Sequence, residues 1–246
     1  MNTPSLVHYL DESLTCAEAA EDPRDYLGIS QLGRCARASG MALKPDVYPA
    51  AVQLESLRFW HEGHTAEDDI VARLQRAGCP VYSRQLKVTF PERHPLHERV
   101  WGHIDGEVPL VPAKAEGLGV AGAAPRLDLA ILEIKSLRAG ALKKLATEGT
   151  VSQAWPQYGI QAHTYALCRG RHWVAFLVKD RNDGTIVECW ESFRADLAES
   201  GIAQGLRVLS DLDAGQLSGR DYNPGSDWQC RKEYCQFRDH CLRAGA

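Results

Sequence analysis

The chain has 246 residues, of which 44% are hydrophobic and 24% charged, and its formal net charge is −4. This composition is ordinary for a globular protein and excludes a mainly disordered chain or a fibre. No apolar run is long enough to span a bilayer, and the first residues do not resemble a secretory signal, so we expect a cytoplasmic protein with no membrane partner. Eight cysteines are many for such a chain, and in a reducing compartment a cysteine cluster is more typical of metal binding or catalysis than of disulfides.

The hydrophobic pattern predicts one α/β domain over residues 1–246, with a mixed central β-sheet flanked by helices. Residues 1–29 are weakly patterned and predict a loop or a short helix. Residues 49–78 predict a long helix whose one face carries Leu57, Trp60, His64, Glu67, Val71 and Leu74. Later elements are expected in this order: strands at 81–90, 98–108 and 127–136, a helix at 153–168, strands at 172–179 and 185–190, and a helix at 194–213. Residues 109–126 are rich in Pro, Gly and Ala and predict a loop.

Acidic residues interrupt two of the predicted strands. The second strand carries Gly102–Gly106 (GHIDG), and the third carries Glu133–Lys135 (EIK). Glu133 and Lys135 are two residues apart, so their side chains point to the same face. A charge on a buried strand is costly unless it is paired or bound to metal. Carboxylates from adjacent strands suit Mg²⁺ or Mn²⁺, and a nearby lysine can activate a water or offset charge on a phosphate.

The Glu-x-Lys triplet alone is a weak signal, because about one is expected by chance in a chain of this length. Taken by itself, it favours a surface salt bridge on an edge strand. However, the run from Leu129 to Leu132 is too apolar for a solvated edge, and Asp105 falls on a neighbouring strand. The combination therefore predicts a site for phosphodiester hydrolysis.

These motifs resemble the PD-(D/E)xK nucleases, in which a Gly-x-x-Asp-Gly strand precedes a Glu-x-Lys strand. Two further features narrow the resemblance to the RecB-like exonuclease branch. A helix bearing His64 (GHTAE) precedes the strands, and a Gln161-x-x-x-Tyr165 helix follows them. The resemblance implies a restriction-endonuclease-like core. It also implies roles for seven residues: His64, Asp105, Glu133 and the carbonyl of Ile134 as metal ligands, Lys135 as the catalytic lysine, and Gln161 and Tyr165 as groups that support the site or contact DNA.

Blander interpretations of the same residues stay open. A lone histidine on an apolar helix face, such as His64, is more often a hydrogen-bonded core residue, although Glu67 on the same face would assist a metal site. Gln157, Gln161 and Tyr165 share one helical ridge, which also suits a polar contact between helices. We assign no role to His61 and His103, which flank the predicted site.

Three cysteines, Cys230, Cys235 and Cys241, lie in the segment 228–241 (WQCRKEYCQFRDHC), and Cys35 lies far upstream. This arrangement resembles the iron–sulfur nucleases of the RecB-like branch, the CRISPR-associated adaptation exonuclease and the AddB nuclease domain. The resemblance implies a 4Fe–4S cluster that closes residues 228–246 onto Cys35. The four residues between the first two C-terminal cysteines depart from the usual two. Four thiolates also suit zinc, for which His240 is an alternative ligand.

Basic side chains near these motifs predict contacts with phosphates, although a solvated surface is the usual role of any single one. They are Arg34, Arg37, Arg138, Lys143, Lys144, Arg231, Lys232, Arg238 and Arg243. Trp228, Tyr234 and Phe237 suit stacking on single-stranded bases, or equally packing beside the cysteines.

The sequence thus predicts a metal-dependent DNA nuclease, foremost an exonuclease for single-stranded or end-resected DNA. The resemblance places it in recombination, repair, or CRISPR or phage DNA processing, with protein partners in such complexes. Two alternatives remain: a structure-specific endonuclease of the same fold, and a non-catalytic DNA-binding assembly subunit.

Overall fold

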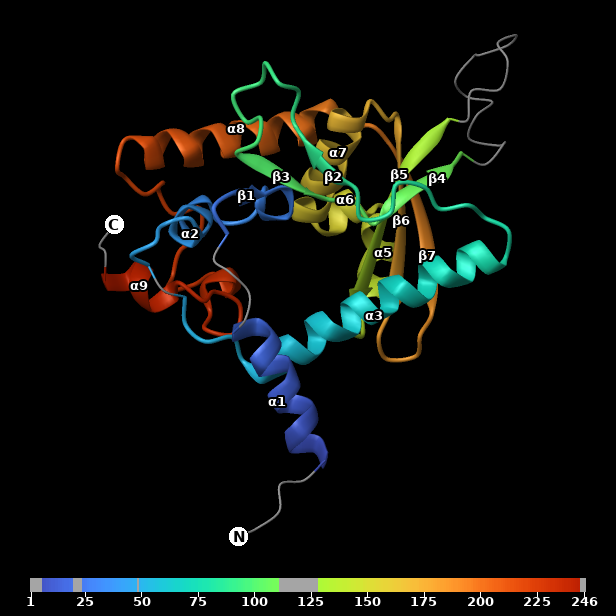
Figure 1. Cartoon of the computed structure of the whole chain (residues 1–246), viewed down its shortest axis with the longest axis horizontal. Helices are drawn as coiled ribbons and strands as arrows, with labels where there is room; N and C mark the ends of the chain where they lie inside the picture. The colour runs from blue at the N-terminus through green and yellow to red at the C-terminus, as the bar shows by residue number, and fades with distance from the viewer. Residues whose placement is uncertain (1–5, 20–23, 48, 111–127, 244–246) are drawn as a thin grey trace.

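The computed structural model describes residues 6–19, 24–47, 49–110 and 128–243 (Figure 1). Most of the predicted loop at 109–126 lies outside these residues. None of the helices in the described ranges has the length and apolar character needed to cross a membrane. The structure is α/β, with mixed sheets flanked by helices, as predicted.

The strands form two sheets, whereas the sequence predicted one. The smaller sheet has the order β1-β3-β2, and the larger has the order β4-β5-β6-β7. Each contains one parallel pair, β1 with β3 and β5 with β6, and is antiparallel elsewhere. The strands are β1 (Leu27–Gly28), β2 (Lys87–Thr89), β3 (Val100–His103), β4 (Gly106–Pro109), β5 (Leu129–Leu137), β6 (Trp173–Asp180) and β7 (Ile186–Ser192).

The predicted strand at 98–108 is in fact two strands, and each belongs to a different sheet. β3 pairs with β1 and β2, whereas β4 pairs with β5. The chain changes partner at Ile104 and Asp105. Ile104 is fully buried, and its N–H donates to the carbonyl of Leu86 at 3.2 Å. This change of partner places Asp105 at the junction of the two sheets.

The predicted strand at 81–90 is shorter than expected. Only Lys87–Thr89 pairs as a strand, and Tyr82 makes an isolated bridge with Glu107. Between them, Ser83 and Gln85 both have φ of 51°, in the left-handed region that a strand cannot use.

The helices are α1 (Leu6–Ala19), α2 (Ala36–Ala42), α3 (Leu54–Arg76), α5 (Ala141–Glu148), α6 (Val151–Ala154), α7 (Pro156–Arg169), α8 (Ala195–Asp213) and α9 (Arg238–Arg243), with the short 3-10 helices η1 (Ile29–Gln31) and η3 (Trp228–Cys230). The three helices that the sequence predicted are present as α3, α6–α7 and α8, whereas α2, α5 and α9 were not predicted. The helix expected at 153–168 is divided, because Pro156 lacks the N–H that would continue α6 and instead begins α7. Gly170, with φ of +62°, ends α7.

Two hydrophobic clusters pack the two faces of the larger sheet. The first lies between α7 and β5–β6 and includes Ile131, Phe176 and Tyr165. The second lies between α3 and the opposite face and includes Leu132 and Val71. Because side chains alternate along a strand, Glu133 and Lys135 follow Ile131 onto the α7 side. The fold therefore directs the two charged residues of β5 toward the helix that carries Gln161 and Tyr165.

The buried face of α3 differs from the predicted one. Its buried residues are Leu57, Ala66, Ile70 and Val71. Trp60 is 47% exposed and His64 is also exposed. The neighbours of the helix determine which face is buried. Its later turns pack against the larger sheet through Ile70 and Val71. In an early turn, Arg58 pairs with Asp11 of α1.

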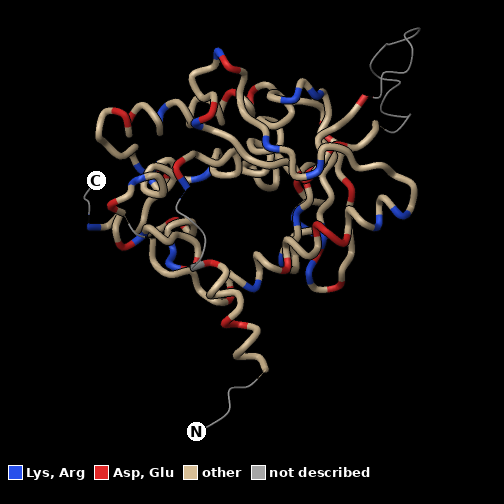
Figure 2. Tube along the Cα trace, viewed as in Figure 1, with Lys and Arg blue, Asp and Glu red and all other residues tan. Residues whose placement is uncertain are grey.

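The C-terminal end of the described chain lies beside α2 and the segment that follows it. Figure 1 shows η3 and α9 beside α2, and the N–H of Ala50 donates to the carbonyl of Gln236 at 3.0 Å. Figure 2 shows basic and acidic residues interspersed over the whole trace. The net charge of −4 is therefore spread over the chain and leaves room for local basic patches.

Candidate functional site

Glu133 and Lys135 form an ion pair on β5. The Nζ atom of Lys135 lies 2.5 Å from Oε1 of Glu133, and the two side chains are 17% and 1% exposed. The other carboxylate oxygen of Glu133, Oε2, is buried and has no hydrogen-bond partner among the described residues. Burial lowers the pKa of Lys135, but the negative charges of Glu133 and Asp105 outweigh it and raise that pKa overall. Lys135 is therefore a cation at neutral pH.

Asp105 approaches this pair from the junction of the two sheets. Its Oδ2 atom accepts a hydrogen bond from the N–H of Ile134 at 2.6 Å. Burial, followed by the negative charge of Glu133, raises the pKa of Asp105 well above its ordinary value. A buried acidic group whose proton affinity is raised by an acidic neighbour is a common feature of functional sites.

Gln161 and Tyr165 of α7 cover the same site. Lys135 Nζ donates to Oε1 of Gln161 at 3.4 Å, and Gln161 also bonds the Tyr165 side chain. Burial, together with the negative charges of Glu133 and Asp105, raises the pKa of the Tyr165 phenol. The structure thus brings together five of the predicted residues: Asp105, Glu133, Lys135, Gln161 and Tyr165.

Tyr158 is a neighbour of the site that the sequence analysis did not select. Lys135 Nζ lies 4.9 Å from the centre of its ring. Tyr158 precedes Gln161 by three residues on α7, so the helical spacing that marked Gln161 and Tyr165 would also have identified it.

Helix α3 contributes Glu67 rather than His64 to this environment. Burial and the negative charge of Glu133 raise the pKa of Glu67, whose Oε1 accepts from Gln85 at 2.6 Å. His64 is exposed. Across the described ranges, no three His, Cys, Asp or Glu side chains stand close enough to hold one metal ion. The roles of His64 and of the Ile134 carbonyl as metal ligands stay predictions.

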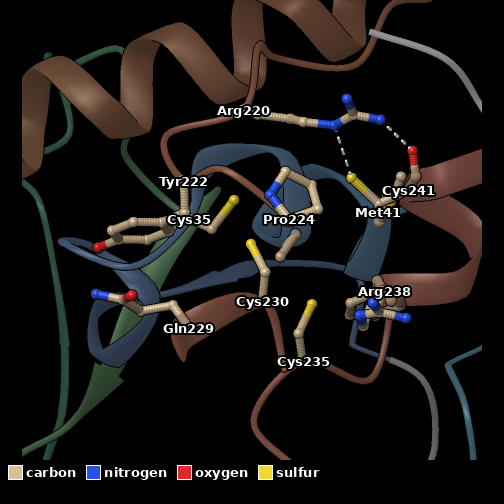
Figure 3. Close-up of a pocket in the computed structure, with 12 residues that line it drawn as sticks. Cys35, Met41, Arg220, Tyr222, Pro224, Gln229, Cys230, Cys235, Arg238 and Cys241 are labelled. Atoms are coloured by element: carbon tan, nitrogen blue, oxygen red, sulfur yellow. Dashed lines mark hydrogen bonds between the residues drawn. The ribbon is translucent and has the colours of Figure 1, made fainter. Parts of the chain in front are cut away.

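The four cysteines singled out by the sequence line one pocket. Figure 3 shows Cys35, Cys230, Cys235 and Cys241 around a shared centre, with their sulfur atoms turned toward it. All four thiols are free and partly buried. Burial, then the neighbouring thiol of Cys35, raises the pKa of Cys230. Cys35 therefore lies in the same pocket as three cysteines that are about two hundred residues later in the sequence.

Arg220 holds one wall of this pocket. Its Nε atom donates to Sγ of Cys241 at 3.2 Å, and Nη2 donates to the Cys241 carbonyl at 2.5 Å (Figure 3). These two hydrogen bonds fix the segment before α9 against Cys241.

Most of the predicted basic contacts are exposed, but one expectation needs correction. Arg37 is only 7% exposed and donates to the carbonyl of Ser218, so it belongs to the interior. The rings of Trp228 and Tyr234 pack edge to face with centroids 5.0 Å apart. Arg138 is exposed, pairs with Glu55 and lies over the ring of Phe59.

Comparisons with known proteins bear on the fold alone. No protein-family model matches the chain, and no curated protein matches it. The crystal structure of SSO0001 aligns with a TM-score of 0.54 at 12% identity, over 97% of this chain and 96% of that one. That likeness shows a shared fold over nearly the whole chain.

Weaker matches are to an alkaline exonuclease, LHK-Exo, from Laribacter hongkongensis. Its crystal structure aligns with a TM-score of 0.49 at 18% identity, over 83% of this chain and 93% of that one. A crystal structure of LHK-Exo in complex with dAMP aligns with a TM-score of 0.44 at 17% identity, over 76% and 91% of the two chains. Neither match carries a functional argument.

Proposed function

We propose that this protein is a divalent-metal-dependent deoxyribonuclease, an exonuclease that hydrolyses phosphodiester bonds of single-stranded or end-resected DNA. The observation that carries the proposal is the buried carboxylate of Glu133: its Oε1 pairs with Lys135, whereas its Oε2 has no hydrogen-bond partner among the described residues. Such an arrangement costs free energy in a purely structural role and is retained where a ligand completes it.

The residues of this site fit a hard divalent cation. An unpartnered buried carboxylate oxygen is the donor that Mg²⁺ or Mn²⁺ prefers. Glu133 and Asp105 would hold the ion, with the carbonyl of Ile134. The helix α3 would add Glu67 as a nearby acceptor or, after a change of side-chain position, His64. When bound, such an ion lowers the pKa of a water and offsets negative charge on the phosphate.

The protein's own side chains supply the remaining chemistry. Lys135 carries a positive charge beside the site and would stabilise the negative charge that grows on a phosphate during attack by water. Gln161 would position Lys135, because its Oε1 accepts from the ammonium group. Tyr165, kept protonated by its raised pKa, would donate its hydroxyl hydrogen to substrate or to a water.

The test is an assay on labelled DNA with Mn²⁺. Wild-type protein should degrade a linear single strand, and Lys135→Ala should abolish the activity. Lys44→Ala, which removes a lysine from the end of α2, is the matched control and should retain it. Full activity in Lys135→Ala would overturn the assignment. Linear and circular substrates separate exonuclease from endonuclease, and tight binding without cleavage would identify a non-catalytic subunit.

The cysteine pocket supports a second part of the proposal, a 4Fe–4S cluster held by Cys35, Cys230, Cys235 and Cys241. Four thiols line this pocket, and thiolates are the donors of both iron–sulfur clusters and zinc sites. The four would draw closer together to hold one group, because no three metal-binding side chains of the described residues meet at one point. When bound, the group would join α2 to the C-terminal segment and contribute folding free energy.

Anaerobic purification tests the metal in this pocket. It should give brown protein whose visible absorbance disappears in Cys235→Ser and persists in Cys16→Ser, which alters an exposed cysteine on α1. Colourless protein that contains zinc would replace the iron–sulfur assignment with zinc. Protein partners in a recombination or CRISPR adaptation complex remain part of the proposal, to be tested by co-purification with the candidate complexes.

A further inference from the structure

The smaller sheet has one buried face and one open face. Val88 and Val100 belong to the first hydrophobic cluster, and Gly102 lies against Tyr165. The side chains that alternate with them point to the opposite face, and these are Lys87, Thr89, Trp101 and His103. Lys87 and His103 are exposed, and Trp101 is half-buried.

Two aromatic rings are stacked on this open face. Tyr26, which precedes β1, stacks on Trp101 with ring centroids 3.4 Å apart and planes inclined by 15°. Lys87 Nζ lies 4.0 Å from the centre of the Trp101 ring, and the guanidinium of Arg24 lies 5.8 Å from the centre of the Tyr26 ring. His103 meets Trp101 edge-on at 5.5 Å. We call these five residues the aromatic–cation ladder.

The ladder borders the candidate active site. His103 precedes Asp105 by two residues at the junction of the sheets. Gly102, which stands between Trp101 and His103 on β3, lies against the hydroxyl of Tyr165. The ladder and the Tyr165 hydroxyl therefore lie on opposite faces of the same short strand, β3, next to the junction that carries Asp105.

The chemistry of the ladder exceeds what packing requires. Stacking of Tyr26 on Trp101 would suffice to fix the start of β1 against β3. It does not explain two exposed cations at the ends of the stack, neither of which forms an ion pair with an acidic side chain in the described ranges. In a chain of net charge −4, aromatic faces combined with cations that have no acidic partner among the described residues suit a ligand that offers flat rings and negative charges.

From this arrangement we infer that the aromatic–cation ladder is a binding subsite for single-stranded DNA beside the cleavage site. A base stacks on the indole face of Trp101 that Lys87 now covers, and the Lys87 ammonium moves to a backbone phosphate. The exchange is favourable because stacking on an aromatic side chain is stronger than an exposed cation–π contact. The inference rests on the proposed function and adds to it the residues that receive the substrate strand.

The test is equilibrium binding of a fluorescein-labelled oligo(dT), measured by anisotropy in EDTA so that no metal-dependent cleavage occurs. Trp101→Ala should weaken binding by roughly tenfold, and Trp101→Phe should restore most of the affinity. Lys87→Ala should lower the slope of log affinity against log salt by about one, because one phosphate contact is lost. Trp60→Ala and Arg73→Ala remove an exposed tryptophan and an exposed cation from α3, and both should bind as wild type.

A second measurement uses the wild-type protein and is independent of variant folding. Irradiation of a complex with 5-iododeoxyuridine-substituted oligonucleotide should cross-link the strand to Trp101 or Tyr26, located by peptide mass spectrometry. Unchanged affinity of folded Trp101→Ala, or a cross-link only at other aromatic residues, would overturn the subsite while leaving the nuclease proposal intact. Wild-type protein that neither binds nor cleaves DNA would overturn both, and preferential binding of oligo(U) would reassign the strand to RNA.

Discussion

A Cβ atom on Gly102 would overlap the hydroxyl oxygen of Tyr165 and lie 3.3 Å from Cζ of the same ring. The glycine of the Gly-x-x-Asp motif thus leaves space for the tyrosine of the Gln-x-x-x-Tyr motif. Two patterns that are independent in sequence meet in one contact, which fixes α7 against the strand that leads to Asp105.

This contact predicts the effect of adding a methyl group. Gly102→Ala should destabilise the protein by about 1–3 kcal/mol, because β3 or Tyr165 must shift to relieve the overlap. Urea unfolding measures the change. Tyr165→Phe removes the overlapping oxygen, so the double variant Gly102→Ala/Tyr165→Phe should be less destabilised than the sum of the single variants. Strict additivity would show that the two residues do not interact.

The Oε2 atom of Glu133, which has no hydrogen-bond partner among the described residues, predicts that Mn²⁺ stabilises the folded protein. At about one hundred times its dissociation constant, the ion should raise the free energy of unfolding by about 2.7 kcal/mol. Glu133→Gln should lose this gain, and EDTA should reverse it in the wild type. Glu199→Gln, an exposed change on α8, is the control and should keep the full gain. Thermal unfolding with and without Mn²⁺ provides the measurement, and an equal gain in Glu133→Gln would place the ion elsewhere.

The buried position of Glu107 predicts that two arginines at the end of α7 stabilise the fold. This side chain is 1% exposed and accepts hydrogen bonds from Arg169 at 3.1 Å and Arg171 at 2.8 Å. Burial raises the pKa of Glu107, but hydrogen bonds from Arg171, Arg169 and Ser83 reverse the effect and lower it to about 2. Removing one arginine leaves the other in place, so Arg171→Ala should cost about 1–3 kcal/mol.

The double variant Arg169→Ala/Arg171→Ala should cost about 3–5 kcal/mol, because it leaves the buried charge of Glu107 unpaired. Urea unfolding of both variants measures these losses. Arg73→Ala, which breaks an exposed pair with Asp69, should change stability by less than about 1 kcal/mol. Equal stability of all three variants would contradict a role for Glu107 in joining β4 to α7.

The hydrogen bonds of Glu191 predict that the stability of the folded protein depends on pH. It accepts from the N–H of Ser152 at 3.0 Å and lies 3.4 Å from Nε2 of the fully buried His163. Burial raises the pKa of Glu191, but the hydrogen bonds of His163 and Ser152 outweigh this and lower it below 4.5. A depressed folded pKa contributes stability above the unfolded value, and that stability is lost as the pH falls through the folded value.

Glu191→Gln should therefore be less stable than wild type at pH 7 by about 1–2 kcal/mol, and the difference should shrink as the pH falls below about 4.5. Urea unfolding of both proteins over this range gives the difference directly. Glu199→Gln should show no such trend, since its side chain is exposed. A difference that grows toward acid would contradict the assigned sign.

Sequence reasoning located the charged centre because its signals are local. The spacing of Glu133 and Lys135 sets their common face in any strand, and the ion pair confirms it. The helical spacing of Gln161 and Tyr165 likewise placed both on one side of α7. The site residues whose positions follow from strand or helix spacing and from chain order could therefore be predicted from the sequence.

Other features depend on partners that no local pattern encodes. Residues 98–108 alternate like one strand, and only the pairing of β3 and β4 with different sheets reveals the break at Asp105. The burial of Arg37 follows from its packing against the segment near Ser218, and the exposure of His64 from what covers α3. The stacked rings of Tyr26 and Trp101 are separated by 75 positions, so neither signalled the other.

The junction at Ile104 and Asp105 separates the sheet proposed to bind the substrate from the sheet proposed to cleave it. Under the proposals made here, the smaller sheet receives the strand through Trp101, and the larger sheet carries the cleaving residues on β5. Substitutions on the first should then raise KM with little change in kcat, and substitutions on the second should lower kcat with little change in KM. Affinity and turnover would accordingly be separately adjustable in this protein, by altering residues on either side of a two-residue link.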